Sequence, residues 1–172
     1  MLVLRDYLNK SGKYVAVYAN VETGQSARND VGRAVGAVCN EIAVRFKDTL
    51  KSDDPVKILK SFKDTEPDSK LNLFLRQLTG ICSLPVVLFI DEIDALVGDS
   101  LVSVLRQLRS GYDDRPESFP QSIILCGVRD VRDYRIVLSN QDIITGGSAF
   151  NIKAKSLRIG DFSIEEIREL YN

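Results

Sequence analysis

The stretch Val86-Val87-Leu88-Phe89-Ile90-Asp91-Glu92 runs five apolar residues directly into two adjacent carboxylates. An uninterrupted run of Val, Leu, Phe and Ile is typical of a strand covered on both faces of a parallel sheet, and Pro85 marks where such a strand can begin. Ligands bind at the carboxyl ends of parallel strands. The sequence therefore predicts that Asp91 and Glu92 lie where a binding or catalytic site would form.

Helical and strand patterns alternate on both sides of this strand. Strands are predicted at residues 14–19, 122–126 and 157–159. The turn signal Ser11-Gly12 precedes the first of them, and Gly127 follows the second. Apolar residues at helical spacing predict helices at residues 2–8, 28–50, 56–62, 71–78, 101–108 and 163–170, the last opened by a capping box of Ser163 and Glu166. Residues 64–69 are expected to form a loop. This order predicts an α/β sandwich with a mostly parallel sheet, in a single domain over residues 1–172.

Composition limits the partners and the compartment. The 23 Lys and Arg residues nearly balance the 24 Asp and Glu residues without long runs of one sign, so nothing supports a nucleic-acid or anionic-membrane surface. The longest apolar run, residues 84–90, is far shorter than a membrane span, and the first residues do not read as a signal peptide. We expect a cytoplasmic protein. With no histidine, Cys39, Cys82 and Cys126 are predicted to be buried free thiols and not zinc ligands.

The combination of segments resembles bacterial ATP-binding proteins of the AAA-like class, close to the signal-transduction ATPases with numerous domains. Four segments carry the resemblance: residues 14–22 as the strand after the phosphate-loop helix, 88–94 as the Walker B motif, 123–130 as the sensor strand, and 150–163 as the last strand and the start of the following helix. They span nearly the whole chain. The resemblance implies a three-layer sandwich with a P-loop-NTPase-like sheet, and a full form that binds ATP and Mg²⁺ and uses hydrolysis as a switch.

The phosphate-binding loop of that class has no counterpart here. The only Gly-Lys pair, Gly12-Lys13, is followed by Tyr14 and has Tyr7 where the first glycine of the motif should stand. Because family members begin with a strand and this loop, we expect an N-terminally truncated domain that lacks its first strand. The family strand order places that strand between residues 157–159 and 122–126. We therefore expect neither ATP nor Mg²⁺ to bind tightly to this chain alone.

The resemblance assigns roles to three side chains. Asp91 would hold Mg²⁺, through water, and Glu92 would orient the attacking water as a base. Arg129, at the end of the sensor strand, would reach the γ-phosphate, because the guanidinium fork matches phosphate oxygens. The structural alternatives are a turn-capping acid for Asp91, an exposed loop acid for Glu92, and for Arg129 an ion pair with Asp91, Asp130 or Asp133.

The sequence gives weaker support for a functional role of other charged residues and of one glycine pair. Asp94 either interacts with the metal-binding residue from outside the coordination sphere or is an acid at the start of a helix, where it interacts with the helix dipole. Arginines that could act in trans on a neighbouring copy are Arg106, Arg109, Arg115, Arg132 and Arg135, although a solvated surface charge is the commoner role of such residues. Gly146-Gly147-Ser148 lacks the lysine of a phosphate loop and is expected to be a turn.

Two further functions fit the same sequence. One is a non-enzymatic interaction domain whose open sheet edge takes up a strand from a partner protein or from another copy of the chain. The other is an unrelated doubly wound domain whose acidic strand end binds a metal or a phosphate. A sheet without its central strand is also expected to be of low stability and to self-associate.

Overall fold

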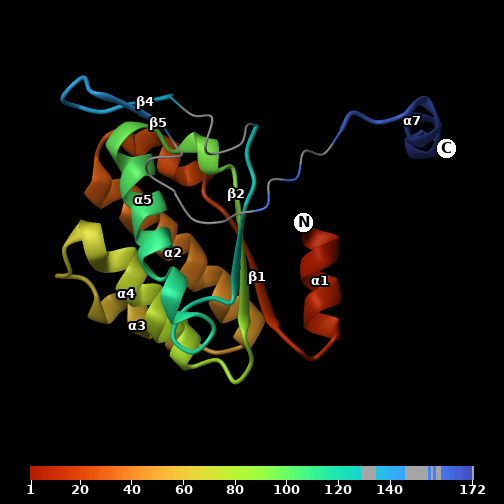
Figure 1. The fold of residues 1–172 in the computed structure, drawn as a ribbon. Coiled ribbons are helices and arrows are strands. Elements are labelled where there is room, and N and C mark those ends of the chain that lie inside the picture. Colours follow the sequence, from red (N-terminus) through yellow and green to blue (C-terminus); the bar gives the residue numbers. More distant parts are fainter. Residues whose placement is uncertain (129–134, 146–154, 156, 158–159, 172) are drawn as a thin grey trace.

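The computed structural model describes residues 1–128, 135–145, 155, 157 and 160–171 (Figure 1). Its centre is a three-stranded parallel sheet in the order β1-β2-β3, formed by β1 (Val15–Asn20), β2 (Val86–Asp91) and β3 (Ser122–Leu125). A small antiparallel sheet pairs β4 (Arg135–Val137) with β5 (Ile143–Thr145). The predicted α/β class and the parallel pairing of the strands before and after β2 are confirmed.

The helices follow the apolar periodicity closely. They are α1 (Leu2–Lys10), α2 (Val31–Leu50), α3 (Asp54–Ser61), α4 (Pro67–Gly80), α5 (Gly98–Ser110) and α7 (Ile164–Leu170), with 3₁₀ turns η1 (Glu22–Ala27), η2 (Ile93–Ala95) and η3 (Tyr112–Asp114). The Asp30 side chain caps α2 by accepting from the Arg33 backbone N–H at 3.0 Å. The predicted capping box of α7 is present, with both of its hydrogen bonds formed.

The sheet separates two apolar clusters, because alternate side chains of a strand point to opposite faces. Val86, Leu88 and Ile90 belong to the main core with buried residues of α2, α4 and α5. Val87 and Phe89 point the other way and form a small cluster with Ala16, against which Leu8 of α1 packs. Figure 1 shows α1 on the opposite side of the sheet from these larger helices. Both faces of β2 are therefore covered, as its unbroken apolar sequence predicts.

The strand β3 differs from the prediction in its burial. The prediction was a buried strand at residues 122–126, but all four residues of β3 are only half-buried. Within the described part of the chain, β3 has a strand neighbour on one side only, whereas β2 is paired on both sides. An edge position explains the greater exposure of β3, since an apolar sequence alone does not distinguish edge from central strands.

At the opposite edge of the sheet, a side chain of α1 pairs with the backbone of β1. The Asn9 amide Nδ2 donates to the Ala16 carbonyl oxygen, and the Ala16 backbone N–H donates to Asn9 Oδ1, both at 2.8 Å. Residues on either side of Ala16 pair with β2, so the polar groups of Ala16 face outward. The Asn9 carboxamide thus supplies the two hydrogen bonds that a neighbouring strand would otherwise make.

Three expectations need correction. The predicted loop at residues 64–69 ends early, because Pro67 occupies the first turn of α4, where its missing N–H is not needed. Of the three free thiols, only Cys39 is buried, while Cys82 and Cys126 are half-buried. The β4–β5 hairpin was not predicted at all, since its strands are only three residues long.

The C-terminal part of the chain is described only in places. Leu157 lies outside any strand, and residues 158 and 159 of the predicted short strand lie outside the described residues, as does the predicted Gly146-Gly147-Ser148 turn. Figure 1 shows α7 standing away from the sheet and its covering helices. Among the helices that the structure describes, none combines the length and the hydropathy needed to cross a membrane.

Candidate functional site

The carboxyl ends of the three parallel strands meet at one edge of the sheet. The register places Asn20 of β1 opposite Asp91 of β2. Cys126 directly follows β3, and its backbone N–H donates to the Ile90 carbonyl at 2.9 Å. The Ile93 N–H in turn donates to the Cys126 carbonyl at 3.0 Å. These bonds fix the position of the turn that carries Asp91 and Glu92, the pair that the sequence predicts to form a site.

Both carboxylate oxygens of Asp91 accept hydrogen bonds. The Tyr18 hydroxyl donates to Oδ2 at 2.6 Å, and the Glu92 backbone N–H donates to Oδ1 at 3.1 Å. Asp91 is half-buried, and its side chain lies on the same face of the sheet as Phe89 because the two are separated by two positions in β2. The bond from Tyr18 shows that this carboxylate is held in one orientation, and sequence reasoning had not predicted Tyr18 as a site residue.

The Tyr18 hydroxyl is perturbed by this contact. The hydrogen bond to Asp91, followed by burial and the negative charge of Asp91, raises the pKa of Tyr18 to about 12. The sequence contained a hint that Tyr18 belongs to the site, because a tyrosine near the carboxyl end of one strand lies close to the last residues of the neighbouring strand. It could not be used without the register, which pairs Tyr18 with Phe89 and so decides which side chains meet.

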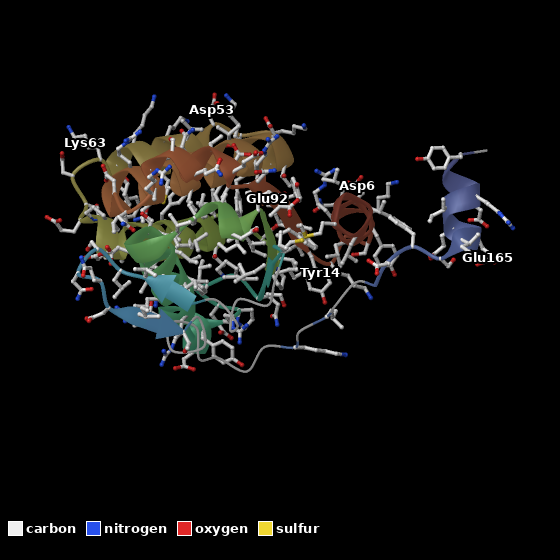
Figure 2. All side chains as sticks on the ribbon, turned by 90° about the horizontal axis from the view of Figure 1, so that it is seen from above. Asp6, Tyr14, Asp53, Lys63, Glu92 and Glu165 are labelled. Atoms are coloured by element: carbon white, nitrogen blue, oxygen red, sulfur yellow. The ribbon has the colours of Figure 1, made fainter. Side chains whose placement is uncertain are left out.

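Glu92 lies at the exposed end of β2 (Figure 2). Its backbone has φ 58° and ψ 40°, the left-handed conformation that non-glycine residues rarely adopt. This conformation turns the chain sharply from β2 into η2 and is compatible with the bond between Ile93 and Cys126. The exposed carboxylate of Glu92 is free to face a ligand above the sheet edge, consistent with either the predicted base or an exposed loop acid.

Cys126 joins the site from the third strand. Burial, and then a hydrogen bond to Asp91 and the charge of Asp91, raise the pKa of the Cys126 thiol above its usual value. The thiol is therefore protonated near neutral pH and is a weak nucleophile. Asp91 therefore has the Tyr18 hydroxyl and the Cys126 thiol as neutral neighbours.

Asp94 lies apart from these contacts, in η2. It lines a cavity of about 410 Å³ between the start of α5 and the β4 strand, together with Asn29 and the apolar residues Leu96, Val97, Gly98, Leu101, Ile136, Val137 and Leu138. Its Oδ1 atom is buried and accepts no hydrogen bond from any residue that the structure describes. No hydrogen bond or ion pair joins Asp94 to Asp91 among the residues that the structure describes.

The structure describes some of the predicted arginines and not others. Arg129 and Arg132 lie outside the described residues, as does the side chain of Arg135. Arg106 and Arg109 are exposed on α5. Arg115 stacks on Tyr112 with 3.6 Å between the guanidinium carbon and the ring centroid, and it donates to the Tyr112 carbonyl at 2.9 Å. It also lies next to Gln121, at the amino end of β3 and so at the opposite edge of the sheet from Asp91.

The arrangement suits a metal ion only in a limited way. Among the described residues, no group of three or more Asp, Glu, His or Cys side chains could hold a metal ion. Mg²⁺ at nucleotide sites is usually bound by one or two carboxylates together with waters and substrate phosphates, and not by a cage of protein ligands. Asp91 fits that use, because its oxygens are hard ligands at the carboxyl end of a parallel strand. Tight binding of Mg²⁺ without phosphates is not expected.

The Tyr18–Asp91 contact predicts a specific pH dependence. Because the pKa of folded Tyr18 lies above its ordinary value, the stabilisation from this bond is complete below pH 10 and is lost as the pH rises through about 12. In Asp91→Asn the charge is removed, so the pKa of Tyr18 should fall toward 10 in an ultraviolet titration of the six tyrosines. The matched variant Glu92→Gln should leave that pKa in place, and equal titration curves for Asp91→Asn and the parent would contradict the contact.

Comparison of the whole chain with known proteins adds no relative. No family model, no curated protein and no solved structure matches it.

Proposed function

We propose that this chain is the Walker B and sensor portion of an AAA-like switch domain that binds and hydrolyses ATP in its full form. The observation that carries the proposal is the position of Asp91 and Glu92, the last residue of β2 and the residue after it, at the carboxyl edge of a parallel sheet. Polar ligands of α/β sheets bind at that edge. The 172 residues contain no Gly-x₄-Gly-Lys-Ser/Thr motif, so the proposal includes no ATP hydrolysis by the chain alone.

The strand order supports this proposal. In the sheet that the resemblance implies, the strand with the two acids lies between the strand after the phosphate-loop helix and the sensor strand. The described sheet has β2 between β1 and β3, in the same parallel arrangement. We propose on this basis that β1, β2 and β3 are the second, third and fourth strands of a P-loop-like three-layer sheet, and that the phosphate-loop strand belongs beside β3.

The side chains at the carboxyl edge of the sheet would have different roles in phosphoryl transfer. Asp91, held by the Tyr18 hydroxyl and the Glu92 N–H, is the residue that would hold Mg²⁺, through water. Mg²⁺, when bound, supplies positive charge that stabilises the transferred phosphoryl group. The exposed Glu92 carboxylate would orient the attacking water and accept its proton. Arg129 would contact the γ-phosphate, a role that rests on the resemblance because this residue lies outside the described part of the chain.

The test adds the element that the motif requires. Isothermal titration of the chain with Mg·ATP should detect no micromolar binding, because no backbone loop or lysine is present to hold the β- and γ-phosphates. A fusion that places a strand and a Gly-rich phosphate loop before Met1 should bind Mg·ATP. In this fusion, Asp91→Asn should weaken the Mg²⁺-dependent binding, whereas Glu92→Gln should bind normally and hydrolyse about 10²–10⁴-fold more slowly.

Two controls make this experiment decisive. Asp64→Asn changes an equally charged, exposed residue in the turn between α3 and α4, outside the sheet, and it should behave like the parent fusion. Replacement of the lysine in the added loop should abolish binding. Micromolar binding of Mg·ATP to the unmodified chain would overturn the claim of inactivity, and a fusion in which Asp91→Asn and Glu92→Gln both match the parent would overturn the Walker B assignment.

A second function, in which the chain binds a partner strand, is favoured by the outer edge of β3. Since Cys126 and alternate residues before it pair with β2, the backbone groups of Ile123 and Leu125 point away from the sheet. In the described residues these groups have no hydrogen-bond partner, so this edge can add a strand. Strand addition would slow amide exchange at Ile123 and Leu125 as protein concentration rises. Fast exchange at every concentration would exclude uptake of a strand from another copy.

A further inference from the structure

The cavity between the start of α5 and β4 has mostly apolar walls. Its volume of about 410 Å³ is in the range of small-molecule sites in proteins. Leu96, Leu101 and Ile136 are almost fully buried and form its inner part. Val97 is 45% exposed and Val137 is 56% exposed, so these two side chains lie at the solvent side. A ligand can therefore enter from the solvent and contact mainly hydrocarbon inside.

Close contacts hold the walls of this cavity in place. Gly98 has a φ of 54°, and a Cβ atom there would lie 1.8 Å from Asn29 Oδ1 and 3.1 Å from the Val137 carbonyl oxygen. The Asp99 N–H donates to Asn29 Oδ1 at 3.3 Å, and the Ser139 N–H donates to Asp99 Oδ2 at 3.0 Å. Figure 1 shows β4 beside the start of α5. These contacts join three segments of the chain, so the cavity is formed before a ligand enters.

A carboxylate without a partner lies at this cavity. Asp94 is the one charged residue among the described residues that line it. Oδ1 of Asp94 is closed off from water and accepts no hydrogen bond, and no described Lys or Arg forms an ion pair with Asp94. Loss of hydration without a partner costs free energy. A positive charge in the cavity offsets this cost without touching Oδ1 itself, because it acts on the whole carboxylate.

The chemistry of the walls specifies the ligand. A carboxylate only accepts hydrogen bonds, and a primary ammonium group offers three N–H donors together with the opposite charge. Apart from Asp94, the only polar side chain among the described lining residues is that of Asn29, which is exposed at the solvent side. A second polar group deep in the cavity would lose its hydration without gaining a partner. The rest of the ligand is therefore apolar.

We propose that this cavity binds a small amphipathic amine. Its ammonium group lies beside Asp94, and its hydrocarbon or aromatic body packs on Leu96, Leu101 and Ile136. The proposal does not depend on ATP binding, because the site uses neither Asp91 nor Glu92. One charge pair and one small apolar contact hold an amine with a single ring, so we expect a Kd of about 1 mM for such a ligand.

The experiment titrates the full chain with 2-phenylethylamine at neutral pH and follows the backbone amides by two-dimensional NMR. The amides of residues 94–101 and 136–138 should shift together. 2-Phenylethanol has the same ring and chain length without the charge, and its Kd should be about tenfold higher. Ethylamine keeps the charge without the ring, and it should also bind about tenfold more weakly, because it leaves the apolar walls uncovered.

Two variants separate charge pairing from an effect on the fold. Asp94→Asn keeps the size of the side chain and removes its charge. It should raise the Kd of 2-phenylethylamine about tenfold and leave that of 2-phenylethanol within about twofold of the parent, which would show that the cavity is still formed. Asp64→Asn removes the charge of an exposed residue in the turn between α3 and α4, and it should change neither Kd.

Several results would overturn the proposal. These are equal Kd values for the amine and the alcohol, an amine Kd that Asp94→Asn leaves unchanged, and amide shifts that are absent or confined to residues outside the cavity. Loss of both ligands in Asp94→Asn would show that Asp94 maintains the wall and does not pair with the amine, and it would overturn the proposal as well.

Discussion

The Asn9→Ala variant is expected to lower the free energy of unfolding by about 2–4 kcal/mol, as measured by urea denaturation. Ala16 is fully buried, and its backbone N–H and carbonyl both pair with the Asn9 carboxamide at 2.8 Å. Truncation removes both partners at once and leaves a buried donor and a buried acceptor unsatisfied, each at a cost of about 1–3 kcal/mol. The exposed edge of β1 should also exchange its amide protons faster.

Two comparisons test this explanation. Asn9→Asp keeps an acceptor for the Ala16 N–H but loses the donor to the Ala16 carbonyl. We therefore expect a substantial decrease in the free energy of unfolding for this variant, although it keeps one of the two bonds. Asn140→Ala removes an exposed asparagine whose side chain, among the described residues, bonds within its own turn, and it should change the free energy of unfolding by less than about 0.5 kcal/mol. A loss in Asn9→Ala no larger than in Asn140→Ala would mean that water replaces the carboxamide at Ala16.

The Gln107→Leu variant is expected to lose about 2–4 kcal/mol of unfolding free energy through a different part of the core. Gln107 is 4% exposed and joins α5 to the first two turns of α4. Its Oε1 accepts from the backbone N–H of Leu71 at 2.8 Å and of Asn72 at 3.3 Å. Its Nε2 donates to the Pro67 carbonyl at 2.9 Å. Leucine has a similar volume but satisfies none of these buried groups.

The control for this variant is Ser103→Ala. Ser103 Oγ accepts from Gln107 Nε2 at 3.0 Å and donates to Asp68 Oδ1 at 3.3 Å. This change therefore removes two side-chain bonds and leaves the three bonds from Gln107 to the α4 backbone in place. We expect a loss of about 0.5–1 kcal/mol. Equal losses in Ser103→Ala and Gln107→Leu would show that the backbone of α4 re-forms its own bonds without the glutamine. Differential scanning calorimetry should give the same order of stability as urea denaturation.

The local elements could be predicted from the sequence because local patterns decide them. Apolar spacing located α2 and α4, and the predicted capping box of Ser163 and Glu166 is formed at α7. The unbroken apolar run of β2 predicted a strand covered on both faces, and the structure confirms it. In contrast, the pattern of residues 122–126 could not predict that β3 is half-buried, since exposure depends on how many neighbours a strand has.

In the candidate site, too, some features could be predicted from the sequence and others depended on the tertiary structure. The sequence alone determined that two carboxylates end a buried strand, because an apolar run followed by Asp91 and Glu92 can be read without knowledge of any other segment. Only the tertiary structure decided that the Tyr18 hydroxyl binds Asp91, that Cys126 joins them and that Asn9 pairs with Ala16. These contacts depend on strand register and on the packing of α1, which place together residues far apart in sequence. A one-residue shift in register would turn each strand side chain to the other face of the sheet, and local sequence does not fix that choice.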